Sequence, residues 1–576
     1  MPTPASQDEV TEAALYGRGT DAASVDGHTP SRPRTASQGW WGSFQHTRRD
    51  GRAAAWSAFA QTLQEAERYR AAVLAYWRAM RRDPVDFPSR HNAGHLLRWL
   101  GHTAAAKATF RELLAINPHD AVAAGQLGHL LVDEGNTRGY HEAEGLLRRA
   151  LDLGADRAAV LVPLCRLLAA QEREREILAL TETETAPAVL NQRGQAQAAL
   201  GDFRGARESF HAVVRQNPNH ARAWHHLSSL KLLADAPAVI GRGSETAADI
   251  LADKAAHAEG QDRVQFAFSA GAALEHAGRY GEAWSWYTDG NARIHARLTP
   301  DVARIEDHER RLAETYTAPV LNQLTRGQIT TPGPAPVFVM GMPRSGTTLM
   351  ERILGAHPEA APLGERADLQ EIQNTMAPGD ESARIAWPEC AAHLRPVAAG
   401  AIAGAYLARV NALAPNAGVA VDKMPEQFKQ AGLIAATMPQ ARIIHMRRDP
   451  RDTGLSCYTA RFHDGLDWTF SLEDIARRYQ SYERLMTHWR ALLPSRCFLE
   501  VDYEALVREP HQQVARVLDF LGLNWDARCV EGHHETEGPV RTMSMGQVRS
   551  GISDTSVGRW RRFGRERVAP LASIRS

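Results

Sequence analysis

The N-terminal half of the sequence repeats itself with a period of about 34 residues. One period separates Pro84 from Pro118, and each proline follows a run of helix-forming residues that ends in RRDP or INP. Alanine or glycine recurs at fixed distances before each proline, and a large residue follows four positions later, as at Ala106 and Phe110. Small residues let two helices approach closely, and proline ends the second helix because it has no N–H to donate. The pattern predicts helix pairs stacked into an α-solenoid.

This period and pattern resemble the tetratricopeptide repeat. Further units precede Pro218, begin at Ala221 and include Gly271, while the turn within 128–150 carries an insertion and the pattern weakens over 156–185. The constant phase of the repeat disfavours the alternative, which is an unrelated bundle of amphipathic helices. The resemblance implies a concave groove that binds a protein or peptide, and it allows a homodimer.

The character of the sequence changes at a Pro- and Gly-rich stretch, 331–336. Short apolar runs then alternate with helical segments, which predicts an α/β domain with a parallel sheet flanked by helices. The expected strands are 336–341, 418–421, 441–446 and 497–502, and the expected helices include Thr348–Ala356 and Ala398–Leu413. The predicted organisation is a disordered leader (1–50), an all-α solenoid (51–300), a connector (301–335) and the α/β domain (336–576).

The first expected strand continues into a glycine-rich turn and a helix, GMPRSGTTLMERIL. Backbone N–H groups in such a turn and the dipole of the helix N-terminus bind phosphate. The spacing from Gly341 to Gly346 is that of a P-loop, but Thr347 replaces the lysine that contacts the β- and γ-phosphates of ATP. Arg344 places a guanidinium in the loop, which suits bidentate contact with oxyanions. The loop is therefore expected to bind a 5′-phosphate whose terminal group is not a triphosphate.

PRSGTTLMERIL resembles the 5′-phosphosulfate-binding loop of sulfotransferases that use 3′-phosphoadenosine-5′-phosphosulfate (PAPS), especially the tyrosylprotein branch. RIIHMRRDPRDTGLSCY resembles the family's 3′-phosphate site, in which Arg448 precedes Ser456. The family's second arginine is displaced by one position here, to Arg461. The resemblance covers about residues 336–565. The nucleotide-binding residues that it implies are Arg344, Ser345, Gly346, Thr347, Thr348, Arg448, Ser456, Tyr503, Ser544 and Arg559.

The same resemblance implies the catalytic groups. Glu365, in PLGERADL, is the expected general base that takes the proton of an acceptor hydroxyl. Arg344, Lys423 and Ser544 are expected to neutralise charge on the sulfuryl and bridging oxygens, so no metal ion is required. Simpler roles stay open, because Glu365 could pair with Arg366 at the surface and Lys423 could form an ordinary salt bridge beside Asp422.

Two other functions fit parts of the sequence. A P-loop kinase or NTPase would use Asp422, in VAVDK, to hold Mg²⁺, although the missing lysine and the Arg448–Ser456 pair argue against it. A repeat scaffold with a non-catalytic nucleotide-binding domain is the other alternative. The acceptor stays open among a peptidyl tyrosine, a carbohydrate and a small-molecule hydroxyl, because a fold does not decide a substrate.

Composition restricts the partners and the compartment. The 67 basic and 67 acidic residues cancel, so nucleic acid is not an expected partner. Five scattered cysteines without CxxC spacing argue against a disulfide framework or a zinc site and favour a reducing compartment. Neither a signal peptide nor an apolar run of about 20 residues is visible, so no membrane span is expected. We expect a cytoplasmic protein.

Overall fold

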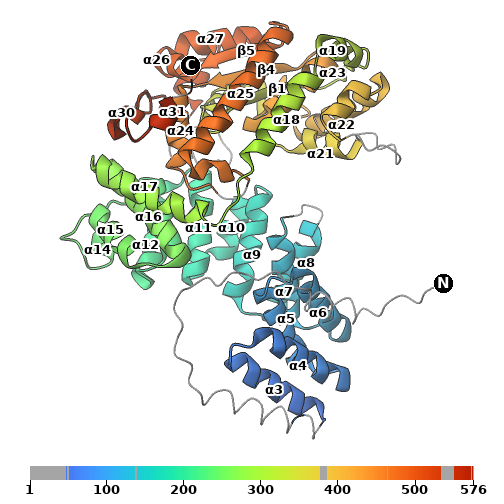
Figure 1. Cartoon of the computed structure of the whole chain (residues 1–576), viewed down its shortest axis with the longest axis vertical. Coiled ribbons are helices and arrows are strands. Elements are labelled where there is room, and N and C mark those ends of the chain that lie inside the picture. The colour runs from blue at the N-terminus through green and yellow to red at the C-terminus, as the bar shows by residue number, and fades with distance from the viewer. Residues whose placement is uncertain are drawn as a thin grey trace. The chain divides into compact units, whose positions relative to one another are not determined.

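The computed structural model divides into two compact units, residues 1–192 and 193–576. It describes residues 47, 51–135, 139–376, 386–462, 465–533, 551–572 and 574. The division falls inside the helical repeats, so the second unit holds the last repeats together with the whole α/β domain (Figure 1). Apart from Thr47, the predicted leader lies outside the described residues. The predicted domain boundaries, the homodimer and the cytoplasmic location stay predictions.

The first unit consists of antiparallel helix pairs, as the period of the sequence predicts. The small residues of the repeat lie where two helices of a pair touch: a Cβ at Gly94 would lie 2.7 Å from Cζ of Phe110, and one at Gly128 would lie 2.7 Å from Cγ of Leu147. The pairs are α3 (Ala53–Glu65) with α4 (Tyr69–Arg82), α5 (Phe87–Trp99) with α6 (Thr103–Ile116), α7 (Ala121–Asp133) with α8 (Tyr140–Asp152), and α9 (Arg157–Ala170) with the short α10 (Glu174–Thr181). The short helix lies where the sequence pattern weakens.

The same pairing continues to residue 295. A Cβ at Gly194 would lie 2.6 Å from Cε1 of Phe210, and one at Gly271 would lie 2.7 Å from Cε1 of Tyr287. The helices are α11 (Pro187–Leu200), α12 (Phe203–Gln216), α13 (Ala221–Ser229), α14 (Ala236–Val239), α15 (Ala247–His257), α16 (Gly260–His276) and α17 (Tyr280–His295). The expected connector is itself helical, with α18 (Val302–Thr315) and α19 (Ala318–Thr325).

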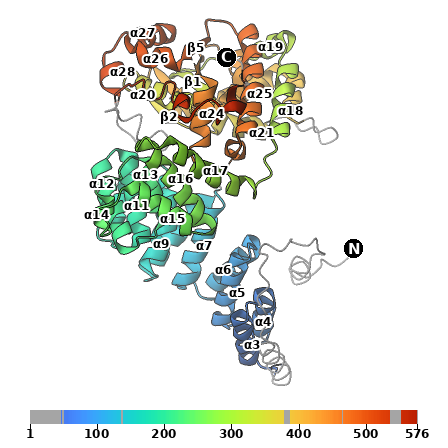
Figure 2. The same ribbon diagram turned by 60° about the vertical axis from the view of Figure 1, so that its left-hand side comes forward.

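The α/β domain contains a five-stranded parallel sheet in the order β2-β3-β1-β4-β5. Figure 2 labels three of these strands, β1, β2 and β5. The strands are β1 (Ala335–Gly341), β2 (Ala360–Gly364), β3 (Val419–Asp422), β4 (Arg442–Arg447) and β5 (Phe498–Asp502). All four expected strands are present, and the structure adds a fifth, β2, which the sequence pattern does not predict. It is a partly exposed edge strand that contains Pro362, so it lacks the continuous apolar run of a buried strand.

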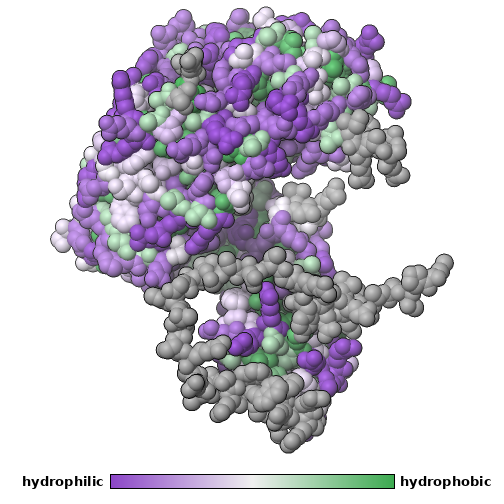
Figure 3. Space-filling view, viewed as in Figure 1, coloured by the Kyte–Doolittle hydropathy of each residue, from purple (hydrophilic) through white to green (hydrophobic). Residues whose placement is uncertain are grey.

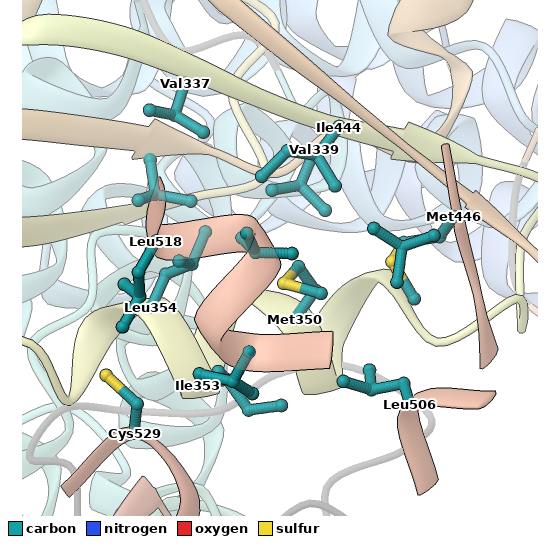
Figure 4. Packing of buried hydrophobic residues seen from close by; sticks show 14 of the residues in the cluster. Val337, Val339, Met350, Ile353, Leu354, Ile444, Met446, Leu506, Leu518 and Cys529 are labelled. Atoms are coloured by element: carbon teal, nitrogen blue, oxygen red, sulfur yellow. The ribbon is translucent and has the colours of Figure 1, made fainter. Parts of the chain in front are cut away.

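Helices cover both faces of the sheet, as predicted. Val337 and Val339 of β1 pack against α20 (Thr347–Gly355) and α27 (Pro510–Leu521) (Figure 4). The alternate residue Phe338 stacks on Tyr406 of α22 (Pro396–Leu413) on the other face. The remaining elements are α21 (Asp368–Met376), η2 (Glu389–His393), η3 (Pro425–Gln430), α23 (Ala431–Thr437), α24 (Pro450–Tyr458), η4 (Asp467–Phe470), α25 (Leu472–Leu492), α26 (Tyr503–Arg508), α28 (Arg528–Glu531), α30 (Trp560–Phe563) and α31 (Ala569–Ala572).

Hydrophilic and hydrophobic residues of the α/β domain are interspersed on the face shown in Figure 3. Within the described ranges, no helix is both long and apolar enough to cross a membrane. All five cysteines are buried and free.

Candidate active site

The glycine-rich turn, residues 341–346, joins the end of β1 to the start of α20. We call this turn the phosphate loop. Gly346, the residue before the helix, has a φ of +102°, and a Cβ there would lie 2.6 Å from Cδ2 of Tyr503. Arg344 has a φ of +70°, which is strained for a residue with a side chain. Met350, Ile353 and Leu354 hold α20 in the core below the loop, so the loop is built on a rigid base (Figure 4). Thr347 and Thr348, the first residues of α20, are buried.

Arg448 follows β4 and connects three segments. Its Nη1 donates to the carbonyl oxygen of Arg344 (2.8 Å), and its Nη2 donates to the carbonyl oxygen of Ser556 (2.8 Å). Its guanidinium carbon lies 4.6 Å from the centroid of the Tyr503 ring. Ser456, on α24, accepts a hydrogen bond from Nε of Arg344 (2.9 Å). The two predicted phosphate-binding motifs therefore meet, because β1 and β4 are neighbours whose carboxyl ends share one edge of the sheet.

The charge around the loop is that of an anion-binding site. Burial, and next the neighbouring Arg448, lower the pKa of Arg344 to about 10. Among the described residues, neither the buried Oγ of Ser345 nor the buried Nε of Arg448 has a hydrogen-bond partner. A bound phosphate would accept hydrogen bonds from such groups and would offset the repulsion between the two guanidinium groups. The residues present therefore fit a phosphorylated nucleotide.

Glu365 and Lys423 lie at the same edge of the sheet, after β2 and β3. Lys423 is 1% exposed and its Nζ forms an ion pair with Oε1 of Glu365, whose side chain is 47% exposed. Arg366, the neighbour of Glu365 in the sequence, pairs with Asp368 (2.6 Å). The two predicted catalytic groups are thus brought together from neighbouring strands.

Asp422 faces the interior beside Lys423. It is fully buried, and its Oδ2 accepts hydrogen bonds from the Tyr406 hydroxyl (2.7 Å) and from Nε2 of Gln427 (3.2 Å). Burial raises the pKa of Asp422 to about 6. A carboxylate held in this way is poorly placed to bind Mg²⁺ at the loop.

Arg559 lies next to the loop but is engaged by a repeat helix. Its Nε and Nη2 each donate to Glu275 of α16 (2.6 Å), and Nη2 also donates to Oγ1 of Thr459 (3.0 Å). Arg559 contributes to the lowered pKa of Arg344, as a nearby cation must. Ser544 lies outside the described residues.

Two acidic residues at the site were not singled out from the sequence. Asp452 of α24 accepts hydrogen bonds from the backbone N–H of Gly558 (2.6 Å) and of Trp560 (3.0 Å). These bonds hold residues 551–572, the C-terminal segment, at the site. Glu351 of α20 lies behind Lys423, with Oε2 3.8 Å from Nζ. In the sequence, Asp452 is one acid within an arginine cluster (RRDPRD), and Glu351 is a lone acid in an apolar helical run (LMERIL).

Residues 336–527 match the sulfotransferase family. These residues form a sulfotransferase domain. Residues 87–120 match the tetratricopeptide repeat, which confirms the solenoid. The sulfotransferase domain thus contains Arg344, Glu365, Lys423 and Arg448, while the predicted C-terminal nucleotide-binding residues lie beyond the matched range.

Proteins similar to this chain include tyrosine sulfotransferases. The chain is 29% identical over 211 residues to protein-tyrosine sulfotransferase A of Caenorhabditis elegans, which covers 34% of this chain and 52% of that protein. It is 33% identical over 312 residues to an uncharacterized protein of Aquifex aeolicus, which covers 53% of this chain and 40% of that protein. The chain therefore spans about half the length, or less, of these relatives.

Among solved structures, the sulfotransferase domain of the Synechococcus PCC 7002 olefin synthase is 18% identical with a TM-score of 0.26, and the match covers 41% of this chain and 97% of that one. The tetratricopeptide-repeat protein YrrB is 23% identical with a TM-score of 0.23, over 31% of this chain and 90% of that one. Sequence identities and TM-scores this low give no information about the substrate.

Proposed function

We propose that the sulfotransferase domain transfers the sulfuryl group of PAPS to an acceptor hydroxyl. The observation that carries the proposal is the junction of the two motifs, in which Arg448 donates to the phosphate loop at Arg344 while Arg344 donates to Ser456. A loop for a 5′-phosphosulfate and an arginine–serine pair for a 3′-phosphate lie side by side, which suits PAPS better than ATP. The match to the sulfotransferase family supports the same reaction class.

Each side chain has a role in binding the donor. Ser345, Gly346, Thr347 and Thr348 would present N–H and hydroxyl groups to the 5′-phosphosulfate at the start of α20. Arg448 and Ser456 would bind the 3′-phosphate. Tyr503 supports both parts, because its ring contacts the guanidinium of Arg448 and lies against Gly346. Ser544 and Arg559 complete the predicted binding set.

The transfer step needs a base and positive charge. Glu365 would accept the proton of the acceptor hydroxyl as the hydroxyl oxygen forms a bond to sulfur. The bond between sulfur and the bridging oxygen breaks, its electron pair stays on the 5′-phosphate, and 3′,5′-adenosine bisphosphate leaves. Arg344 and Lys423, with Ser544, would stabilise the charge that develops on the sulfuryl and bridging oxygens. Positioning and charge carry the catalysis, as they do in phosphoryl transfer.

The relatives favour a protein acceptor. Several are named protein-tyrosine sulfotransferases, which makes the hydroxyl of a peptidyl tyrosine the first acceptor to test. The solenoid would bind the protein or peptide that carries it, since stacked repeats present an extended concave surface. Carbohydrate and small-molecule hydroxyls are the alternative acceptors.

Nucleotide-dependent thermal stability tests the proposal. We expect 3′,5′-adenosine bisphosphate to raise the melting temperature of the purified protein, because a ligand at 100 times its dissociation constant stabilises the bound state by ~2.7 kcal/mol. Mg-ATP is expected to have little effect, because Thr347 replaces the P-loop lysine and Asp422 is buried in other hydrogen bonds. The shift is measured by differential scanning fluorimetry.

Arg448→Ala is the matching variant. It removes the guanidinium assigned to the 3′-phosphate, so the bisphosphate shift should be lost. A shift with Mg-ATP alone would show that the domain is a kinase or NTPase, and the absence of any shift would contradict nucleotide binding by the domain.

A further inference from the structure

Glu351 is a buried carboxylate that contacts Lys423 and the residue that precedes Glu365 in the chain. It lies on α20, the helix that begins in the phosphate loop, and is 8% exposed. Its Oε1 accepts a hydrogen bond from the backbone N–H of Gly364 (3.0 Å), the residue that precedes Glu365. Its Oε2 lies 3.8 Å from Nζ of Lys423. One side chain thus connects the phosphate-binding helix to the ends of β2 and β3.

We propose that Glu351 is a positioning residue that holds Glu365 and Lys423 in the geometry for sulfuryl transfer. The inference rests on the proposed function of the domain, and it adds a residue that the sequence resemblance does not assign. Glu351 would not contact the donor or the acceptor, since it acts through Gly364 and Lys423.

The packing gives Glu351 the rigidity that this role needs. Its neighbours Met350 and Ile353 are fully buried in the core under the sheet. Glu365, in contrast, has a half-exposed side chain on the loop after an edge strand. The hydrogen bond to Gly364 ties the start of that loop to the rigid helix. A displacement of about 1 Å at a reacting group can cost ~10²-fold in rate, so a tie of this kind matters.

The charges give Glu351 a second effect. Lys423 lies between two carboxylates, Glu351 and Glu365. When Glu365 accepts the acceptor's proton it becomes neutral, and Lys423 would lose the partner with which it pairs here. Glu351 then leaves one negative charge beside the buried ammonium. Without the Glu351 carboxylate, Lys423 would pair with Glu365 alone. The lysine charge would then disfavour proton transfer to Glu365.

The ionisation state of Glu351 should change within the pH range of an activity assay. Burial raises the pKa of Glu351 to about 7, and Lys423 opposes this rise. The other charged groups that act on it are Glu365 and Asp422, which both raise its pKa. Glu351 should lose its charge as the pH falls below about 7, and the rate should fall with it.

Glu351→Gln tests the charge and Glu351→Met tests the charge and the hydrogen bond together. Glu351→Met should lower kcat by about 100-fold, because Gly364 loses its partner and Glu365 is no longer held in place, with little change in the KM for PAPS or in bisphosphate binding. Glutamine can still accept from Gly364, so Glu351→Gln should lower kcat by less, through the lost charge alone. The readout is release of bisphosphate from PAPS with a tyrosyl peptide as acceptor, and with water as the only acceptor. Glu389→Gln, which removes a carboxylate paired with Arg311 outside the site, should match the wild type.

The outcomes separate this inference from the proposed function. Wild-type protein that binds the bisphosphate but never cleaves PAPS would overturn the function itself. An active wild type together with an equally active Glu351→Gln would overturn only the role of Glu351. The wild-type pH profile gives a second test that needs no variant: a rate that rises with pH through about 7 supports the inference, and a flat rate from about pH 6 to 8 contradicts it.

Discussion

Glu365→Gln is expected to lower the turnover of sulfuryl transfer by about 10²–10⁴-fold, which is the usual contribution of a general base. Glutamine has nearly the same shape as glutamate but cannot accept the proton of the acceptor hydroxyl. Its amide also ends the ion pair with Lys423. Because Glu365 lies after β2 and outside the phosphate loop, the affinity for 3′,5′-adenosine bisphosphate should stay close to that of the wild type.

Two measurements on the same protein check this result: kcat with PAPS and a tyrosyl peptide, and the thermal shift with the bisphosphate. Glu371→Gln is a matched control, because it makes the same change on α21 at an exposed carboxylate that lies 3.8 Å from Arg409. Full activity in Glu365→Gln would mean that another group, or water, takes the proton. A parallel loss of nucleotide binding would instead show that Glu365 holds the loop in place.

The phosphate site could be predicted from the sequence because its parts are local. The loop, with Arg344 and Gly346, lies in one strand–turn–helix segment, and Arg448 precedes Ser456 within a second one. Parallel strands carry both segments to the same edge of the sheet, so two short motifs are enough to indicate one site. The solenoid was predictable for a related reason, since each repeat contacts mainly its neighbours.

Other features depend on contacts that no local pattern records. The edge strand β2 is short and partly exposed, so it lacks an apolar run that would reveal it. Glu351 occurs in the sequence as one acid in an apolar helix. Its proposed role depends on Gly364 and Lys423, which the fold brings to α20 from the ends of β2 and β3. The predicted role of Arg559 follows from the resemblance alone, and its partner Glu275 is 284 residues away in the chain.

Glu275 and Arg559 form an ion pair that links a repeat helix to the C-terminal segment of the sulfotransferase domain. The Glu275 side chain is 16% exposed and that of Arg559 is 20% exposed. Burial alone would raise the pKa of Glu275, but the Arg559 guanidinium outweighs it and holds the pKa below its usual range. The hydroxyl of Tyr287 also donates to Glu275 (3.1 Å).

Arg559→Met should therefore lower the free energy of unfolding by about 3 kcal/mol. This is the lower end of the range for stranding a buried charge, because both side chains keep some contact with water. Without Arg559, burial would raise the pKa of Glu275, and the folded state would bind a proton more tightly than the unfolded state. The loss of stability should then shrink as the pH falls and grow as it rises. Urea unfolding followed by tryptophan fluorescence at several pH values measures both effects.

The double variant Glu275→Gln/Arg559→Met separates structure from nucleotide binding. Glutamine still accepts from Tyr287 and carries no charge, so the double variant should recover most of the stability lost in Arg559→Met. If the two losses simply add, the pair is not the source of the effect. With the fold restored, bisphosphate binding reports on Arg559 alone: weaker binding supports its predicted contact with the nucleotide. Unchanged binding would leave Arg559 as the residue by which the repeats hold the C-terminal segment against the phosphate loop.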